Sequence, residues 1–151
     1  MLVEPEIPQN TGNVARTCAL TGSVLHLVRP LGFSLEDRYL RRAGLDYWGQ
    51  VEVKVWDSFA ELQQALAPAA GRTHLATTRA QRLYTEVRYG PHDVLVFGRE
   101  TTGLPAALLE AHPECTVRIP MRPLGRSLNL SNAVAVVLYE ALRQNGFPGL
   151  A

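Results

Sequence analysis

The stretch DVLVFGRETTGLP, residues 93–105, joins an apolar run to a glycine-containing turn. A run of Val and Leu that ends in glycine is typical of a buried strand, and Pro105 favours the first turn of a following helix. Gly98 and Gly103 have the spacing of a phosphate-binding loop, but Leu104 and Pro105 stand where that loop needs Lys and Ser or Thr. The G-x-G-x-x-G pattern is also absent, so neither a nucleoside triphosphate loop nor a dinucleotide site is indicated.

Four further stretches have the same strand pattern, and helical patterns lie between them. The strand candidates are GSVLHLVRP (22–30), VEVKVW (51–56), THLATT (73–78) and CTVRIP (115–120). Helices are expected at 10–22, 36–42, 57–68, 104–113 and 133–146. Alternating strands and helices predict one α/β domain, residues 1–151, with a mostly parallel sheet covered by helices on both faces.

Capping residues mark the ends of two of these helices. Asn10 or Thr11 is expected to begin the first helix, and Gly22 to end it. The pattern S-x-x-E at 58–61 is a capping box that begins a second helix, which Pro68 is expected to close. Residues 30–50 and 120–130 do not fit the alternation of strands and helices and are expected to be long connections. Long connections of this kind often carry function.

Composition excludes several classes of protein. Hydrophobic residues make up 46% and charged residues 19% of the 151 residues, a balance typical of one folded domain. No secretion signal or membrane-spanning run is evident, so the expected location is the cytoplasm, with no membrane partner. The two cysteines and four histidines lack the spacing of metal ligands, and no metal is expected.

The positive charge is arginine-rich and small in sum. A net charge of +1 argues against nucleic-acid binding by bulk electrostatics. Only Lys54 among the 15 basic residues is a lysine, which fits local RNA binding and also fits a codon bias. Arg16 follows Gly12 by four residues and Asn13 by three, so it can share a helix face with them and offer a charged fork to an anion. A solvated arginine fits the same spacing.

Three polar side chains stand before the last helix: Asn129, Ser131 and Asn132. One helix cap needs one such side chain, so two are surplus. The helix that follows, AVAVVLYEAL, is apolar on nearly every side, and one sheet face can cover only half of it. The other half is expected to meet a second subunit, with deep burial inside a monomer as the alternative. Small residues would allow close approach there, namely Ala133, Ala135 and Ala141.

Three motifs in this order resemble the SPOUT class of RNA methyltransferases over essentially the whole chain. They are PEIPQNTGNVARTCA (5–19), FGRETTGLP (97–105) and IPMRPLGRSLNLSNAVAVVLYE (119–140). With RRAGLDYW (41–48), the chain looks like the TrmL type, the compact tRNA (cytidine/uridine) 2′-O-methyltransferases that act at the wobble nucleotide. The resemblance implies a C-terminal deep trefoil knot, a homodimer and the cofactor S-adenosylmethionine, with S-adenosylhomocysteine as product. The first strand is shorter than expected for the family.

The resemblance also implies roles for particular residues. Cofactor contacts, largely through backbone groups of three loops, fall on Ala76, Thr77, Gly98, Glu100, Ile119, Met121, Ser127 and Leu128. The catalytic neighbourhood, partly across the dimer interface, consists of Asn10, Arg16, Glu100, Ser127, Asn129 and Asn132. Because no separate RNA-binding domain is present, tRNA phosphates are expected to meet the arginines of the dimer surface, with Arg38, Arg41, Arg42, Arg122 and Arg126 as candidates.

The chemistry explains why an arginine is useful. Methyl transfer from a sulfonium to a ribose hydroxyl is an in-line displacement that needs alignment and removal of a weakly acidic proton. Since a guanidinium stays protonated, Arg16 is expected to stabilise developing alkoxide charge and position a phosphate rather than act as a base. The alternatives are action on ribosomal RNA or another tRNA position, a non-catalytic RNA-binding module of the same fold and, more distantly, a small-molecule α/β enzyme.

Overall fold

The computed structural model describes residues 1–44, 47–67 and 71–151, apart from the side chains of residues 41 and 43. The strands are β1 (Leu2–Val3), β2 (Leu25–Val28), β3 (Val53–Trp56), β4 (Thr73–Ala76), β5 (Val94–Val96) and β6 (Thr116–Val117). The helices are α1 (Pro8–Thr21), α2 (Arg38–Gly44), α3 (Phe59–Leu66), α4 (Ala106–Ala111) and α5 (Leu130–Gln144), with 3₁₀ turns at Trp48–Gln50 and Pro113–Cys115. Each expected strand stretch contains a strand, and α2 confirms the short helix expected near residues 36–42.

The strands form two three-stranded sheets that meet at β1. β2 lies between β1 and β3, and Leu27 pairs with Leu2 on one side. In the second sheet β4 lies between β5 and β6. A parallel bridge between Leu2 and Phe97 joins the two sheets, and the Val3 N–H donates to the Phe97 carbonyl at 2.8 Å. All strand pairs of the described residues are parallel, which confirms the expected parallel sheet.

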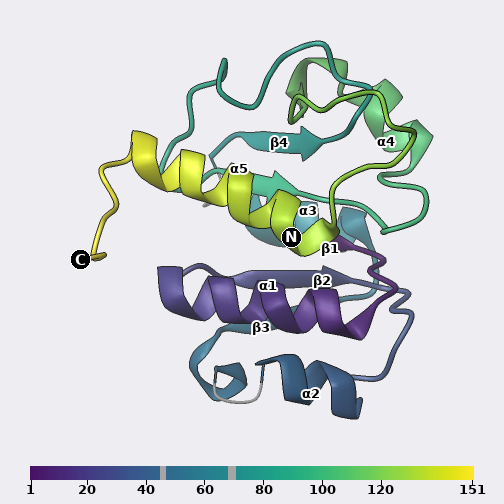
Figure 1. The fold of residues 1–151 in the computed structure, drawn as a ribbon, viewed down its shortest axis with the longest axis vertical. Coiled ribbons are helices and arrows are strands. Elements are labelled where there is room, and N and C mark those ends of the chain that lie inside the picture. Colours follow the sequence, from purple (N-terminus) through teal and green to yellow (C-terminus); the bar gives the residue numbers. More distant parts are fainter. Residues whose placement is uncertain (45–46, 68–70) are drawn as a thin grey trace.

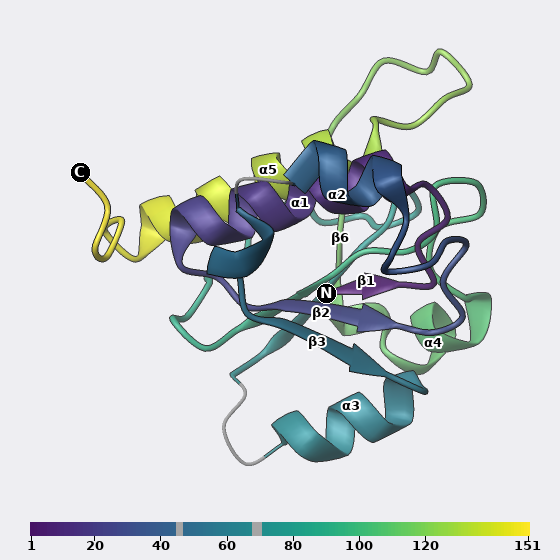
Figure 2. The same ribbon diagram turned by 90° about the horizontal axis from the view of Figure 1, so that it is seen from below.

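Helices cover both faces of the sheets. Figure 2 shows α1, α2 and α5 on one face, with α3 and α4 on the other. On the first face α1 and α5 lie side by side (Figure 1), and Val14 and Val137 are buried against Leu27. On the second face Leu62 of α3 is buried with Val96 of β5. Burial on both faces fits the continuous apolar run of β5, whereas β3 at a sheet edge carries the exposed Lys54.

The first helix starts earlier than its polar residues suggested. α1 begins at Pro8, and its N-cap residue is Ile7, with φ −108° and ψ 114°. Proline is well suited to this first position because its missing N–H would have no partner inside the helix. The expectation that Asn10 or Thr11 caps the helix is therefore wrong, since both lie inside it. Gly22 ends the helix in the left-handed region, with φ 67°, as expected.

The other helix starts follow their sequence signals closely. Ser58 is the N-cap of α3, and its hydroxyl accepts a hydrogen bond from the Glu61 N–H at 3.1 Å, which confirms one half of the expected capping box. The Glu61 carboxylate accepts from the N–H of Asp57 at 2.9 Å, one residue before the N–H of Ser58 that a capping box uses. Pro68, expected to close that helix, lies outside the described residues. Pro105 is the N-cap of α4, one residue before the first turn in which it was expected.

The final helix, α5, has a buried face and an exposed apolar face. Val134, Val137 and Ala141 belong to the core. Val136 and Tyr139 are 36% and 47% exposed, so the helix is not fully covered by its own chain. Deep burial of the whole helix within a monomer is thus excluded. Ala141, expected among the small residues that meet a second subunit, faces the core instead.

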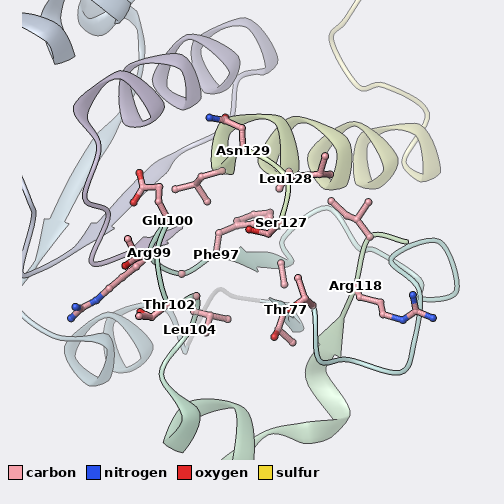
Figure 3. Close-up of a pocket in the computed structure, with 18 of the residues that line it drawn as sticks. Thr77, Phe97, Arg99, Glu100, Thr102, Leu104, Arg118, Ser127, Leu128 and Asn129 are labelled. Carbon is pink, nitrogen blue, oxygen red and sulfur yellow. The ribbon is translucent and has the colours of Figure 1, made fainter. Parts of the chain in front are cut away.

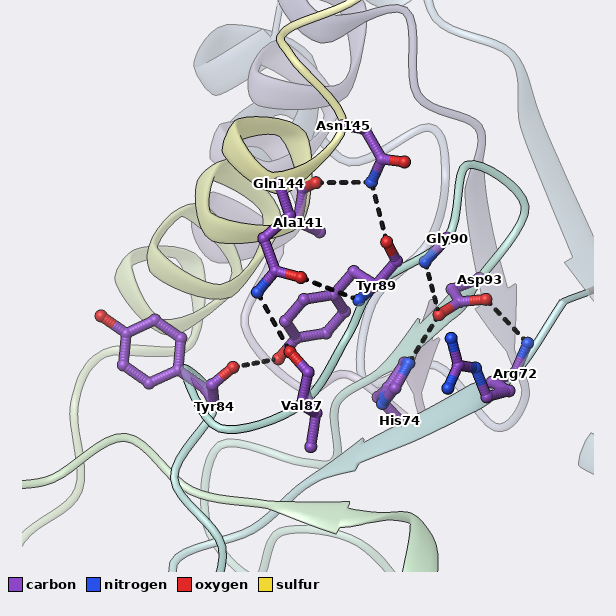
Figure 4. Close-up of polar contacts among 10 residues, drawn as sticks. All are labelled: Arg72, His74, Tyr84, Val87, Tyr89, Gly90, Asp93, Ala141, Gln144 and Asn145. Atoms are coloured by element: carbon purple, nitrogen blue, oxygen red, sulfur yellow. Dashed lines mark hydrogen bonds and ion pairs between the residues drawn. The ribbon is translucent and has the colours of Figure 1, made fainter.

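Side chains from the last turn of α5 bind the segment 84–90 (Figure 4). Gln144 Oε1 accepts from the Tyr89 N–H at 3.0 Å, and Gln144 Nε2 donates to the Val87 carbonyl at 3.0 Å. Asn145 Nδ2 donates to the Tyr89 carbonyl at 3.1 Å. These bonds satisfy backbone groups of a segment without regular structure, and they tie the end of α5 to it.

Asp93, just ahead of β5, organises the other side of the same segment. Its carboxylate accepts from the Arg72 N–H at 2.8 Å and the Gly90 N–H at 2.9 Å, and it lies 2.8 Å from His74 Nε2. Burial acts to raise the pKa of Asp93, but the hydrogen bonds from Gly90, His74 and Arg72 outweigh it, so the pKa lies below its ordinary value. The buried carboxylate is therefore kept ionised by its donors.

Candidate active site

A cavity of about 560 Å³ opens beyond the carboxyl ends of β4, β5 and β6, where parallel α/β sheets bind ligands (Figure 3). Its walls come from segments that follow these strands and from the start of α5. The segments involved are 76–79, 97–104, 117–119 and 125–130, joined by Ile7, Asn10, Leu109, Met121, Ala133 and Val137. The three sequence motifs thus meet at one cavity although they are far apart along the chain.

Most residues singled out by the resemblance line this cavity. The cofactor set lies there in full, namely Ala76, Thr77, Gly98, Glu100, Ile119, Met121, Ser127 and Leu128. Of the catalytic set, Asn10, Glu100, Ser127 and Asn129 line it, whereas Arg16 and Asn132 stand outside the lining. Ala133, expected near a second subunit, lines the cavity of its own chain.

Gly98 is a position at which the backbone approaches itself closely. A Cβ built on Gly98 would lie 2.1 Å from the carbonyl carbon of Gly103 and 2.2 Å from the Leu104 nitrogen. Arg99 and Gly103 close this loop by exchanging two backbone hydrogen bonds, of 3.2 and 3.0 Å. The close approach shows that Gly98 is required for the shape of the loop.

Glu100 occupies the N-terminus of α1. Its carboxylate accepts from the Glu6 N–H at 2.7 Å and from the Ile7 N–H and Asn10 Nδ2 at 3.1 Å each. Ile7 has no polar side chain with which to cap its own helix, so a carboxylate from the distant loop supplies the acceptor. The positive end of the helix dipole favours this anion. The anion-binding role expected for the start of α1 is thus taken by the chain's own Glu100.

Asn10 links Glu100 to the start of α5. Asn10 Oδ1 accepts from Asn129 Nδ2 at 2.9 Å, so Asn10 bridges the two motifs with its amide. Asn129 is the N-cap of α5, and its Oδ1 accepts from the Ser131 N–H at 2.9 Å and the Ser131 hydroxyl at 2.6 Å. Ser131 and Asn132 lie in the first turn of α5 rather than before it. Asn129 therefore both caps α5 and links it to α1 through Asn10.

Arg16 lies along α1, away from the cavity of its own chain. Six residues separate it from Asn10, which corresponds to about 9 Å along a helix. Its side chain is exposed, and its guanidinium stacks on the ring of Tyr47, 4.9 Å from the ring centroid. The structure thus does not bring Arg16 together with the rest of the expected catalytic set within one chain.

The arginines expected to contact RNA are spread over two regions. Arg38 and Arg42 are exposed on α2, and Arg38 stacks on Tyr39, 4.8 Å from the ring centroid. The side chain of Arg41 lies outside the described part of the chain. Arg122 and Arg126 are exposed on the loop 120–129, and Arg126 lines the cavity.

Three further arginines line the cavity: Arg79, Arg99 and Arg118. Arg99 follows a buried strand, at the sheet edge where α/β proteins bind ligands, whereas Arg79 and Arg118 were not expected from the sequence. Figure 3 shows Arg99 and Arg118 extending in opposite directions from it. Arg99 pairs with Glu4, and Arg118 Nε donates to the Gln81 carbonyl at 3.4 Å. Arg118 is next to Ile119 of the third motif, and that position was the only available signal for it.

The described part of the chain holds neither a metal-ligand cluster nor a membrane-spanning helix. Within residues 1–44, 47–67 and 71–151, no group of three or more His, Cys, Asp or Glu side chains is arranged to hold a metal ion. Over the same residues, no helix has both the length and the apolar character needed to span a bilayer.

A parallel sheet with a cavity at the carboxyl ends of its strands, partly apolar and partly rimmed by polar loops, is typical of an α/β enzyme that binds a small-molecule cofactor. The chain belongs to the SpoU rRNA Methylase family, whose model matches residues 1–139. The resemblance to the SPOUT class is thereby confirmed.

Individual relatives are similar over nearly the full chain. A tRNA (cytidine(34)-2′-O)-methyltransferase from Burkholderia ambifaria is 54% identical, covering 99% of this chain and 96% of that protein. A structure described as giving structural insights into the 2-OH methylation of C/U34 on tRNA has 49% identity and a TM-score of 0.90, covering 96% of this chain and 93% of that one. An AdoMet-bound rRNA methyltransferase from Sinorhizobium meliloti shares the fold at 24% identity and a TM-score of 0.83, covering 94% of this chain and 54% of that one.

Proposed function

We propose that this chain is an S-adenosylmethionine-dependent tRNA methyltransferase that methylates the ribose 2′-hydroxyl of cytidine or uridine at position 34. One observation carries the proposal: the three motifs converge on a single cavity in a chain whose full-length relative, 54% identical, is a tRNA (cytidine(34)-2′-O)-methyltransferase. The cavity offers a binding site for the methyl donor, and the activity of the relative indicates the substrate. The rRNA methyltransferase from Sinorhizobium meliloti is 24% identical, so its likeness supports the fold and not the substrate.

The cavity fits S-adenosylmethionine in size and chemistry. Its volume of about 560 Å³ lies within the range of about 300–1,000 Å³ usual for small-molecule sites. Phe97 and Leu104 offer apolar surface for a purine ring, while the loop around Gly98 exposes backbone donors and acceptors. The residues that would hold it are Ala76, Thr77, Gly98, Glu100, Ile119, Met121, Ser127 and Leu128. When bound, this cofactor supplies a methyl group carried on a sulfonium.

The polar residues Asn10, Arg16, Glu100 and Asn129 are suited to positioning parts of the site and not to removing the proton of the ribose hydroxyl. Both carboxylate oxygens of Glu100 are engaged by N–H donors, so Glu100 is suited to orienting the start of α1 and unsuited to accepting a proton. Asn10 and Asn129 extend this framework to the start of α5. Arg16 contributes a permanent positive charge, which would stabilise charge on the ribose oxygen and hold a phosphate.

A homodimer would bring Arg16 to a cavity. Arg16 is exposed and lies outside the cavity of its own chain, so it can complete the site of a second copy. The neighbouring helices also leave apolar side chains uncovered: Leu20 near the end of α1 is 55% exposed, and Val136 and Tyr139 of α5 are exposed as well. Apolar side chains on two adjacent helices are the kind of surface that homodimers bury.

We also propose a knotted chain and a cytoplasmic site of action. We expect residues 1–151 to form one domain whose C-terminal part is a deep trefoil knot, and the bonds between Gln144, Asn145 and the segment 87–89 would hold the threaded end. The protein is expected to act in the cytoplasm, where its tRNA substrate is found. Tracing the chain in a crystal structure of this protein would test the knot.

For the RNA, we propose contacts by the exposed arginines around the cavity and on α2. Arg38, Arg41, Arg42, Arg122 and Arg126 are the expected set, to which Arg79 and Arg118 can be added because they line the cavity. Guanidinium groups bind phosphates bidentately and stack on unpaired bases, as an anticodon loop presents them.

The proposal is tested with purified protein, unmodified tRNA and S-adenosylmethionine labelled in its methyl group. Label is expected on the ribose of nucleotide 34 after digestion to nucleosides. A matched tRNA with a 2′-deoxynucleotide at position 34 lacks the acceptor oxygen and should stay unlabelled. Label at another position or only on ribosomal RNA would redirect the substrate, and an absence of both methylation and cofactor binding would leave a non-catalytic RNA-binding module as the better description.

A further inference from the structure

The segment 4–10 and the loop 98–103 hold each other through side chains in both directions. Glu100 of the loop accepts N–H groups from the start of α1, as described above. In return, Glu6 of the segment binds Thr101 of the loop, and Glu4 forms an ion pair with Arg99. We call this set of contacts, made by the carboxylates of Glu4, Glu6 and Glu100, the carboxylate clamp.

The bond between Glu6 and Thr101 reaches the cavity wall from behind. The Thr101 N–H donates to Glu6 Oε2 at 3.1 Å, and the Thr101 hydroxyl lies 3.0 and 2.8 Å from the two carboxylate oxygens. Thr101 lines the cavity, whereas Glu6 stands outside the lining. Glu6 can therefore influence a ligand in the cavity only through the loop that it holds.

The loop needs such an external hold. Its internal bonds, the pair between Arg99 and Gly103, close the turn but do not orient it relative to the sheets. Hydrogen bonds to a carboxylate are about twice as strong as neutral ones, and two donors on one residue restrict its rotation. Together with Glu100 and the ion pair of Arg99 with Glu4, Glu6 thus fixes the direction in which the turn points, and with it the position of this part of the cavity wall.

Glu4 has an unfavourable backbone conformation that is held in place by tertiary contacts. Glu4 has φ +52°, a conformation that L residues other than glycine rarely adopt. Its N–H donates to the Val28 carbonyl at 2.8 Å while its side chain reaches Arg99. Conformations of this kind persist where the surrounding contacts over-determine them.

From these contacts we infer that Glu6 is a positioning residue for cofactor binding: through Thr101 it holds the loop 98–103 in the shape that binds S-adenosylmethionine. The inference rests on the proposed function for the identity of the ligand, and it assigns a role to a side chain that does not touch the cavity. Loss of Glu6 then weakens cofactor binding while the chemical step, once cofactor is bound, proceeds at nearly its normal rate.

The test measures the Kd for S-adenosylhomocysteine by calorimetry in Glu6→Ala, Glu6→Gln, Thr101→Val and the double variant Glu6→Ala/Thr101→Val. Glu6→Ala is expected to raise the Kd roughly tenfold, the size expected for directly coupled side chains. Glu6→Gln keeps one acceptor oxygen and should recover part of the loss. The double variant should bind nearly as Glu6→Ala does, because the two side chains act on one contact.

A matched control removes a charge elsewhere. Glu52 is exposed beside β3 and pairs with Lys54 at 2.9 Å, so Glu52→Gln should bind S-adenosylhomocysteine as the wild type does. In methyl transfer, Glu6→Ala should raise the KM for S-adenosylmethionine with kcat at saturating cofactor within about twofold of wild type. A kcat that falls while the KM and Kd stay unchanged would contradict a positioning role in cofactor binding.

Folding is followed by thermal melting of the same samples. If Glu6→Ala lowers the Tm but binds S-adenosylhomocysteine like the wild type, the clamp only stabilises the fold and the inference is wrong. If Glu6→Ala does not fold, Thr101→Val decides, because it removes only the hydroxyl contact and should still raise the Kd. A wild-type chain that binds S-adenosylhomocysteine and methylates tRNA keeps the proposed function whatever the clamp variants do, whereas one that binds no cofactor overturns both.

Discussion

Gly98→Ala is the substitution for which the structure makes the sharpest prediction. The added methyl group would meet backbone atoms at 2.1, 2.2 and 2.4 Å, where ordinary contacts lie at 3.4–4 Å. These atoms belong to Gly103 and Leu104, so relief requires the loop to move by more than 1 Å and to break the backbone pair between Arg99 and Gly103. We expect a loss of about 1–3 kcal/mol in the free energy of unfolding, as for other overpacked sites.

The effect on ligand binding should exceed the effect on stability. A displacement of about 1 Å in a site can cost on the order of 10²-fold in function, so the Kd for S-adenosylhomocysteine should rise by a similar factor. Calorimetry measures this, and urea unfolding measures the stability. Gly49→Ala is the matched control, because a methyl group there meets nothing within 4 Å. Wild-type affinity in Gly98→Ala would refute the argument that the close approach shapes the binding loop.

Three further predictions follow from other contacts. Tyr47→Leu removes the ring under Arg16 and should lower kcat by about two- to fivefold, the worth of an exposed cation–π contact, with cofactor Kd unchanged and recovery in Tyr47→Phe. The pKa of Asp93 is lower in the folded chain than in the unfolded one. The ionised Asp93 therefore stabilises the fold above the ordinary carboxyl pKa, and this contribution is lost as the pH falls through the pKa of the folded state. The free energy of unfolding should drop below about pH 4, and the drop should be less steep in Asp93→Asn. Val136→Glu places a charge on the exposed apolar face of α5 and should give a monomer in sedimentation. This monomer should bind cofactor but transfer methyl groups poorly. If the variant were still a dimer, the interface would have to lie elsewhere.

The sheet was predictable where strands are long enough to show a pattern. The stretch 93–98 contains β5 because a strand covered on both faces leaves a continuous run of Val and Leu, and 73–78 contains β4 around Leu75. β1 (Leu2–Val3) and β6 (Thr116–Val117) have two residues each, but β6 lies within the strand-like stretch 115–120, whereas no such stretch surrounds β1. Its role is to join the two sheets through the contact of Leu2 with Phe97, and a pairing of residues so distant in sequence leaves no local signal.

The cavity lining could be predicted by resemblance and much less from chemistry. Ala76 and Leu128 carry no reactive group, so only the resemblance to a known family pointed to them. Arg79 and Arg118 were missed because an arginine in an exposed loop looks the same in sequence whether it borders a cavity or bulk solvent. The resemblance implied a catalytic neighbourhood partly across a dimer interface but did not say which residues lie apart from the rest, and in the structure Arg16 is one that stands outside the cavity of its own chain.

The wrong N-cap prediction for α1 has a physical cause that also explains the site. A helix start normally carries a small polar residue, but position 7 lines the cavity and is an isoleucine, so it cannot serve both purposes. The acceptor is instead Glu100, ninety-three residues further along the chain from Ile7. Completing the start of α1 and closing the binding loop are therefore one structural event. The order of the helix start should depend on the presence of the loop, and an isolated peptide of residues 1–22 should fray at residues 6–10.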